Sequence, residues 1–258
     1  MRLQGKVAFI TGAARGIGRE YALRFAQEGA AIAAVDLRGD DAEATAQLVR
    51  DAGGRALAIE ADVTSEEQMA KAAQRAVDEL GKIDVLINNA AIYGDMDITD
   101  QSVDYFIKLL NVNVLSVVVT SRAVFPHIKA AGGGCIINIS STAAYPLPIP
   151  MAGDPQTVPI SGYAVSKAAV IHLTKWMAST LGGANVRVNA IAPGLTMTDA
   201  TKKIVPGFIM DSVTKNTALK RQLDPTDLTG TAVYLASDDS ALMTGQVLVV
   251  DGGLVMLG

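Results

Sequence analysis

Short apolar runs rich in Val, Ile and Ala recur along the chain, and longer stretches with apolar residues three or four positions apart lie between them. A short run that is apolar at nearly every position is typical of a strand buried on both faces of a sheet. The pattern predicts strands at Val7 to Thr11, Ala31 to Asp36, Ala56 to Glu60, Val85 to Asn88, Cys135 to Ser140, Val186 to Ile191 and Val247 to Val250.

The stretches between these runs have the periodicity of helices, as in Gly16 to Glu28, Glu66 to Leu80 and Asp224 to Ser237. Successive strands are too far apart for hairpins, so they must be parallel and joined by crossovers. The pattern therefore predicts an α/β fold: a single-domain, Rossmann-type, doubly wound parallel sheet of about seven strands with helices on both faces. We expect residues 1–258 to form this one domain.

Two segments interrupt the alternation. Residues 143–160 contain five of the nine prolines, which excludes a helix interior or a central strand. Residues 195–217 form a long connection after the sixth strand. Both follow carboxyl ends of strands, where open α/β sheets bind ligands. We expect a proline-rich insertion at the rim of a site and a substrate lid; the alternative for each is a solvated surface loop.

The composition narrows the class of protein. Half of the 258 residues (50%) are apolar, 19% are charged, and the net charge is −4. This acidic balance argues against nucleic acid or an anionic membrane surface as a partner. No uncharged apolar stretch reaches the roughly 18 residues of a membrane span, and the start lacks the pattern of a signal peptide. We therefore expect a cytoplasmic protein with a small-molecule substrate.

Thiol and metal chemistry find little support in the sequence. Cys135 is the single cysteine, which excludes an intrachain disulfide and fits a reducing compartment. We expect it to be a buried small apolar residue rather than a nucleophile. The two histidines, His127 and His172, lie far apart, so no metal is expected.

A glycine-rich turn follows the first strand and opens the first helix. From Thr11 to Gly18 the sequence reads T-G-A-A-R-G-I-G. Gly12 permits a tight turn, Gly16 allows the backbone to approach a pyrophosphate, and Gly18 allows close packing of helix on strand. The turn predicts a dinucleotide site; the alternative is a strand–helix turn that binds no phosphate.

An acidic residue ends the second strand. A carboxylate at Asp36 can accept hydrogen bonds from both ribose hydroxyls of the adenosine half and repels a 2′-phosphate, which favours NAD over NADP. Arg15 and Arg38 lie nearby and carry the charge that attracts a 2′-phosphate. NADP therefore stays the less favoured alternative.

A tyrosine and a lysine open the helix after the fifth strand. Tyr163 and Lys167 are four positions apart, so they lie on one helix face. An ammonium beside a phenol stabilises the phenolate and brings the tyrosine pKa toward the working pH. Alone, this spacing is a weak motif, and a pair on the helix surface is its other interpretation.

In company with other motifs, this pair gives the sequence a clear resemblance to the short-chain dehydrogenase/reductase family, of the classical type. The resemblance covers essentially the whole chain, and Ala91, where the family often has glycine, is a small departure. It rests on the glycine turn, Asp62-Val63, the stretch from Asn88 to Ala91, Asn113, Ser141, Tyr163 with Lys167, Pro193-Gly194 and the stretch from Val250 to Gly253.

The resemblance implies roles for four catalytic residues. Tyr163 would be the general acid/base, and Ser141 would hydrogen-bond the substrate oxygen. Lys167 would bind the nicotinamide ribose and lower the pKa of Tyr163, and Asn113 would hold a water on the path to solvent. Ser140 is adjacent to Ser141, but strand alternation sends the two to opposite sides and the family pattern favours the second. The same pattern favours Asn113 over Asn111.

The resemblance also implies a set of cofactor-binding residues. Asp62 and Val63 would bracket the adenine, and Thr196 and Thr198 would hold the carboxamide. The full set is Gly12, Arg15, Gly16, Ile17, Gly18, Asp36, Leu37, Asp62, Val63, Asn89, Ala90, Ala91, Tyr163, Lys167, Pro193, Gly194, Thr196 and Thr198.

The sequence thus predicts an NAD-dependent oxidoreductase that acts on a secondary alcohol or ketone. The apolar stretch from Ile204 to Met210 in the expected lid suggests a hydrophobic or cyclic substrate. An NADPH-dependent 3-oxoacyl-thioester reductase is the alternative, and a non-catalytic cofactor-binding regulator is a remote one. The resemblance further implies that the single domain, residues 1–258, both binds the dinucleotide and carries the catalytic groups, and that the chain forms a homo-oligomer, a tetramer or a dimer. The net charge of −4 leads us to expect no nucleic acid or membrane partner.

Overall fold

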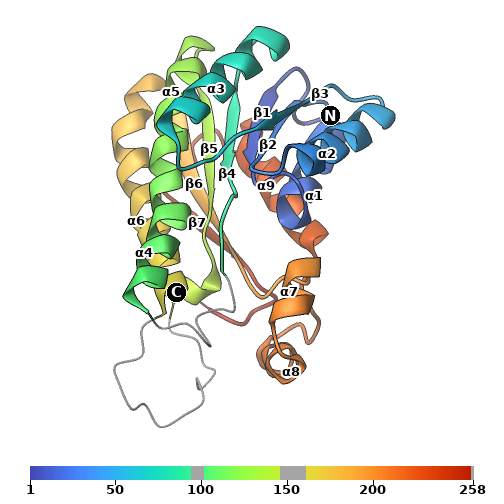
Figure 1. The fold of residues 1–258 in the computed structure, drawn as a ribbon, viewed down its shortest axis with the longest axis vertical. Coiled ribbons are helices and arrows are strands. Elements are labelled where there is room, and N and C mark those ends of the chain that lie inside the picture. The colour runs from blue at the N-terminus through green and yellow to red at the C-terminus, as the bar shows by residue number, and fades with distance from the viewer. Residues whose placement is uncertain (94–101, 146–160, 257–258) are drawn as a thin grey trace.

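Seven parallel strands form one sheet, in the order β3-β2-β1-β4-β5-β6-β7 (Figure 1). The computed structural model describes residues 1–93, 102–145 and 161–256. The strands are β1 (Val7–Thr11), β2 (Ala31–Asp36), β3 (Ala56–Glu60), β4 (Val85–Asn88), β5 (Gly134–Ile139), β6 (Val186–Pro193) and β7 (Val247–Val250). The order reverses between β1 and β4, so a ligand-binding crevice is expected at the carboxyl ends of these two strands.

Helices cover both faces of the sheet. They are α1 (Gly16–Gln27), α2 (Gly39–Asp51), α3 (Glu66–Leu80), α4 (Val103–Leu110), α5 (Ser116–Ala130), α6 (Gly162–Leu181), α7 (Asp199–Ile204), α8 (Gly207–Asn216) and α9 (Thr229–Ala236). One core forms where α1 and α9 pack on the sheet, and a second forms under α3, α5 and α6. The predicted doubly wound α/β fold is confirmed.

The apolar runs predicted the strands closely because the inner strands of this sheet are buried on both faces. All five residues of β1 are buried, for example. β5 and β6 differ from the prediction at their ends. β5 stops at Ile139, so Ser140 lies just beyond it, and β6 continues to Pro193, which pairs with Val250 of β7.

The structure differs from the sequence analysis in two helical segments. The predicted helix from Asp224 to Ser237 begins as a 3-10 turn, because Asp224 and Asp227 cap each other's backbone N–H groups. The expected lid, residues 195–217, is not an irregular loop but contains α7 and α8. Thr198 starts α7 by accepting a hydrogen bond from the backbone N–H of Thr201 at 3.0 Å. Of the predicted proline-rich insertion, residues 146–160 lie outside the described residues.

One long helical run crosses the second face. A π-helical turn, Asn111–Leu115, joins α4 to α5 without a break. Within the described residues, only this run, Val103–Ala130, is long and apolar enough to span a membrane by length and composition. Length and composition alone are weak evidence for a membrane span, because a core helix of a soluble protein can have the same length and composition. Val119, Val124 and Ile128 of α5 are buried in the second core, which accounts for part of its apolar character.

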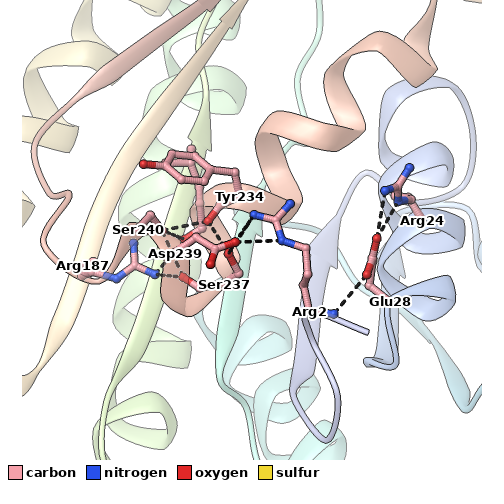
Figure 2. A network of polar contacts seen from close by, with 9 residues as sticks. Arg2, Arg24, Glu28, Arg187, Tyr234, Ser237, Asp239 and Ser240 are labelled. Carbon is pink, nitrogen blue, oxygen red and sulfur yellow. Dashed lines mark hydrogen bonds and ion pairs between the residues drawn. The ribbon is translucent and has the colours of Figure 1, made fainter.

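A network of polar contacts joins the N-terminal segment to the turn after α9 at the amino ends of the strands (Figure 2). The backbone N–H of Arg2 donates to Glu28 at 3.0 Å, and its guanidinium donates to Ser237 Oγ at 3.2 Å and pairs with Asp239. Arg187, near the start of β6, donates to the backbone oxygen of Ser237 at 3.3 Å. These contacts hold the N-terminal segment against the turn after α9, at the end of the sheet opposite to the expected crevice.

Candidate active site

A cavity of about 1740 Å³ opens at the carboxyl ends of the strands. It is bounded by the glycine turn after β1, the ends of β4 and β5, the start of α6 and the lid with α7 and α8. Of the residues that the sequence predicts for the site, only Gly18 and Asn113 do not line the cavity. The residues that do line it are Gly12, Arg15, Gly16, Ile17, Asp36, Leu37, Asp62, Val63, Asn89, Ala90, Ala91, Ser141, Tyr163, Lys167, Pro193, Gly194, Thr196 and Thr198.

The glycine turn has the shape of an anion site. Gly12 has a φ of +65°, and a side chain there would overlap Ala90. A side chain on Gly18 would overlap the backbone oxygen of Gly12, so α1 packs directly on the turn. No side chain of the described residues caps the start of α1. Its first backbone N–H groups therefore stay available to a phosphate.

Asp36 is held in place by the backbone. Its two carboxylate oxygens accept hydrogen bonds from the N–H groups of Ala14, at 3.0 Å, and Arg38, at 3.1 Å. The guanidinium of Arg38 lies 3.8 Å from Asp36 but 2.9 Å from Asp41. The charge of Arg38 is thus already matched by two acids, which weakens its attraction for a further phosphate.

Lys167 lies one helical turn after Tyr163 and is only 3% exposed. Its Nζ donates to the backbone oxygen of Ile139 at 2.9 Å and lies 5.6 Å from the centre of the Tyr163 ring. Burial lowers the pKa of Lys167 to about 8. A cation this close favours the ionised phenol, so the pair is suited to proton exchange near neutral pH.

The two adjacent serines turn to different partners. Ser140 is buried, and its Oγ donates to the backbone oxygen of Lys167 at 2.8 Å. Ser141 accepts a hydrogen bond from the N–H of Ala143 at 3.1 Å. As an acceptor in that bond, Ser141 keeps its own O–H able to donate to an oxygen in the cavity.

Asn113 lies in the π-helical turn, is 1% exposed and supports the site from behind. Its Oδ1 accepts from the N–H of Ile92 at 2.8 Å, and its Nδ2 donates to the oxygen of Ile92 at 2.8 Å and to Ser166 Oγ at 3.0 Å. The side chain thus uses its donor and its acceptor on protein groups. Because both Nδ2 hydrogens are used, a water held by Asn113 would have to donate to one of its oxygens, Oδ1 or the backbone oxygen.

The comparisons with known proteins agree with this geometry. Residues 12–255 match a family model described as enoyl-(acyl carrier protein) reductase. The chain is 37% identical over 257 residues to the 7alpha-hydroxysteroid dehydrogenase of Escherichia coli (strain K12), covering 98% of this chain and 95% of the relative. The chain belongs to the short-chain dehydrogenase/reductase family.

A second relative and a solved structure extend the comparison, and the names of the relatives include different substrates. A 3-oxoacyl-[acyl-carrier-protein] reductase of Thermotoga maritima is 36% identical over 256 residues, which is 99% of this chain and 100% of that protein. A solved 7 alpha-hydroxysteroid dehydrogenase, in complex with NADH and 7-oxo glycochenodeoxycholic acid, superimposes with a TM-score of 0.89 at 37% identity. That comparison covers 99% of this chain and 96% of the other. Both are oxidoreductases of the family, and so is this chain.

Two residues expected to touch the cofactor also organise this dehydrogenase/reductase fold. Asp62 accepts hydrogen bonds from the N–H of Thr64, at 2.8 Å, and from its hydroxyl, at 2.7 Å. Nδ2 of Asn89 donates to the backbone oxygens of Thr11 and Gly12, both at 3.0 Å. Each side chain therefore shapes a turn at the cavity wall.

The sequence analysis missed a buried polar network beneath the site of this family member. Asn88 Nδ2 donates to Asn138 Oδ1 at 2.8 Å, and Asn138 Nδ2 donates to Thr174 Oγ1 at 2.9 Å. The network joins β4 and β5 to α6, the helix that carries Tyr163. An asparagine inside the otherwise apolar run of β5 was the available signal. The analysis also missed Tyr93, which lines the cavity beside Tyr163.

The single thiol lies away from this site. Cys135 is buried in β5, and burial raises the pKa of its thiol to about 11. A thiol with a raised pKa stays protonated and unreactive, which is typical of a structural cysteine. In the parts of the chain that the structure describes, no three His, Cys, Asp or Glu side chains are grouped as metal ligands.

Proposed function

We propose that this chain transfers a hydride between NAD(H) and a secondary alcohol or ketone, on an apolar, ring-bearing substrate. The observation that carries the proposal is that Ser141, Tyr163 and Lys167 line one cavity with the uncapped start of α1 and with Asp36. A non-catalytic, cofactor-binding regulator would have no need of the first three residues.

The residues around the glycine turn fit a dinucleotide. The uncapped start of α1 suits a pyrophosphate, and the close approach at Gly12 leaves room for backbone contacts. Asp36 stands where the adenosine ribose would lie, with Leu37 and Val63 on the cavity wall beside it. A fixed carboxylate there disfavours a 2′-phosphate, and one solved relative holds NADH. We therefore assign NAD rather than NADP.

The residues of the site then have distinct tasks in the reaction. When bound, the nicotinamide supplies or accepts the hydride. Tyr163 gives a proton to the substrate oxygen in reduction and takes it in oxidation, while Ser141 donates a hydrogen bond to that oxygen as its charge develops. Lys167 supplies positive charge beside the phenol and reaches the ribose hydroxyls. Asn113 positions the loop and the helix that meet at the site.

The base of the lid would hold the nicotinamide end. Thr196 is buried, with its hydroxyl donating to the oxygen of Gly194 at 3.0 Å. Thr198 packs near Gly16 of the glycine turn, where a side chain would come within 3.3 Å of the threonine methyl. Both threonines thus stand between the lid and the cofactor cradle, as the assignment requires.

The substrate side of the cavity is apolar. Met197, Val205, Phe208, Ile209 and Leu254 line it, and Phe208 is 72% exposed at its mouth. An exposed aromatic ring beside an apolar wall favours a hydrophobic partner of matching size. Together with the hydroxysteroid dehydrogenases among the relatives, this supports a steroid or another fused-ring substrate.

A 3-oxoacyl-thioester reductase is the second candidate. It is favoured by the acyl-carrier names of the matched family and of the Thermotoga maritima relative. Asp36 weighs against it, because the alternative requires NADPH and a carboxylate opposes the 2′-phosphate. The fixation of Arg38 by Asp36 and Asp41 weighs in the same direction.

The deciding experiment is a panel of steroidal, cyclic and aromatic alcohols and ketones with both cofactors, followed by NADH or NADPH absorbance. We expect turnover of a fused-ring alcohol with NAD. A kcat/KM that is highest for a 3-oxoacyl thioester with NADPH would overturn the proposal in favour of the second candidate. The absence of NADH binding and of any turnover would overturn both.

Asp36→Ser should change cofactor preference. We expect kcat/KM with NAD to fall about 10- to 100-fold, as for the loss of charge-assisted hydrogen bonds, while kcat/KM with NADP rises. The measurement is kcat/KM for both cofactors with one substrate. Asp40→Ser is the matched control, since Asp40 lies outside the cavity lining and should leave both values unchanged. An unchanged ratio in Asp36→Ser would remove the basis for assigning NAD.

We assign a soluble, cytoplasmic homo-oligomer, a tetramer or a dimer. Exposed apolar side chains on α4, the π-helical turn and α6 support self-association; they are Val103, Ile107, Leu115, Val165 and Trp176. The first three belong to the long helical run and account for a further part of its apolar character. The buried free thiol of Cys135 supports a reducing compartment.

A further inference from the structure

Tyr93 stands where the catalytic helix and the lid face each other across the cavity. It follows β4 by a few residues and lines the cavity with Tyr163 and Thr201. The residue before it, Ile92, is bonded through both its N–H and its oxygen to Asn113. The backbone that carries Tyr93 is therefore fixed from the rear.

That fixation extends to the catalytic tyrosine. Asn113 also donates to Ser166 Oγ at 3.0 Å, and Ser166 Oγ donates to the backbone oxygen of Tyr163 at 2.7 Å. The rings of Tyr93 and Tyr163 meet edge to face, with centroids 6.2 Å apart and planes at 66°. This is a favourable aromatic geometry, so the ring of Tyr93 restrains the direction in which the Tyr163 phenol points.

The hydroxyl of Tyr93 faces the lid. It lies 3.5 Å from Oγ1 of Thr201, which is 6% exposed on α7. Thr201 Oγ1 lies 2.9 Å from Oγ1 of Thr198, the residue that starts α7 and packs near the glycine turn. One row of hydroxyls thus leads from Tyr93 to the base of the lid.

The 3.5 Å gap between the Tyr93 and Thr201 hydroxyl oxygens is about 0.7 Å longer than a normal hydroxyl–hydroxyl hydrogen bond. A small inward shift of α7 closes it, and such a shift brings the apolar lid residues toward the substrate. We propose that Tyr93 is a positioning residue that orients Tyr163 with its ring and holds the closed lid with its hydroxyl. This inference rests on the proposed function.

The two parts of the side chain are tested by two substitutions. Tyr93→Phe keeps the ring, so kcat should stay within about twofold of wild type while the substrate KM rises about 3- to 10-fold, as for one lost hydrogen bond. Tyr93→Leu removes the ring contact as well, so kcat should fall in addition. Tyr234→Phe, on α9 outside the cavity lining, is the matched control and should change neither constant.

The partner hydroxyl is tested on Thr201. Thr201→Ser keeps the hydroxyl and should behave as wild type, whereas Thr201→Val should raise KM. Because Tyr93→Phe and Thr201→Val remove one shared contact, the double variant should fall short of the product of the two KM increases. Fully multiplicative effects would show that the two hydroxyls act independently and would overturn the inference.

A readout independent of turnover uses the exposed Lys202 and Lys203 of α7 as trypsin sites. A fluorescence titration of each variant first sets a saturating NADH concentration. At that concentration we expect trypsin to cleave at these lysines about 3- to 10-fold faster in Tyr93→Phe than in wild type. Without NADH the two rates should agree. Equal rates in NADH would overturn the inference alone, whereas a wild-type chain that binds no NADH would overturn the proposed function with it.

Discussion

Tyr163→Phe is expected to lower kcat about a thousandfold while leaving NADH affinity within about twofold of wild type, because general acid/base catalysis contributes on the order of 100- to 10,000-fold. The substitution removes the phenolic proton but keeps the ring. The edge contact with Tyr93 and the approach of Lys167 to the ring therefore remain. The loss should appear in the chemical step and not in binding.

Steady-state kinetics with NAD and NADH fluorescence titration separate these two outcomes. Tyr234→Phe serves again as the control for loss of a tyrosine hydroxyl outside the cavity. If Tyr163→Phe keeps more than about a tenth of the wild-type kcat, another group exchanges the proton and the mechanism proposed here is wrong.

Lys167→Met should abolish activity and stabilise the ligand-free protein at pH 7. We expect kcat/KM to fall at least about a hundredfold, since the cation beside the phenol is lost, and with it the group proposed to bind the nicotinamide ribose. We also expect the free energy of unfolding to rise by about 2 kcal/mol at pH 7, because the variant no longer buries an ammonium and loses only one hydrogen bond to Ile139.

The pH dependence gives this prediction its sign. The folded chain releases the Lys167 proton at about pH 8, and the unfolded chain releases it at its ordinary pKa of 10.5. Between these values the unfolded state binds more protons, so wild-type stability gains a contribution as pH rises through this window. Lys167→Met lacks that contribution, and its advantage should shrink from pH 8 to pH 10.5.

Urea denaturation of both proteins from pH 7 to pH 10 measures the effect. Lys175→Met, on the exposed part of the same helix, is the matched control and should change stability little at any pH. A loss of stability in Lys167→Met at pH 7 would mean that its bond to Ile139 outweighs the cost of burial. A buried lysine that lowers stability is expected where the side chain serves activity, as proposed for Lys167.

The sheet was readily predicted because its physics is local. The inner strands, such as β1 and β4, are buried on both faces, so they must be apolar at nearly every position, and the run ends where the strand leaves the core. The edge strands β3 and β7 are only partly buried. The same holds for the glycine turn. The positive φ at Gly12 and the packing at Gly18 each demand a residue without a side chain, whatever the rest of the chain does.

The lid was harder to predict because short helices depend on single caps and on packing. Thr198 starts α7 with one side-chain bond, a signal that many non-helical threonines share. The π-helical turn at Asn113 was not foreseen either. It places a buried amide against both backbone groups of Ile92, a contact between residues 21 positions apart.

The sequence by itself determined the parallel α/β sheet, the cradle for a dinucleotide and the residue types of the reaction, since these follow from burial and from motifs within a few residues of each other. Only the tertiary structure decided how those residues are held. The fold alone buries Lys167 deeply enough to lower its pKa, turns Ser140 to the backbone of α6 and leaves Ser141 at the cavity. It also brings Tyr93 within reach of Thr201, 108 positions later. Such contacts join elements that meet only after the sheet has assembled, and no local pattern encodes a distance across a cavity.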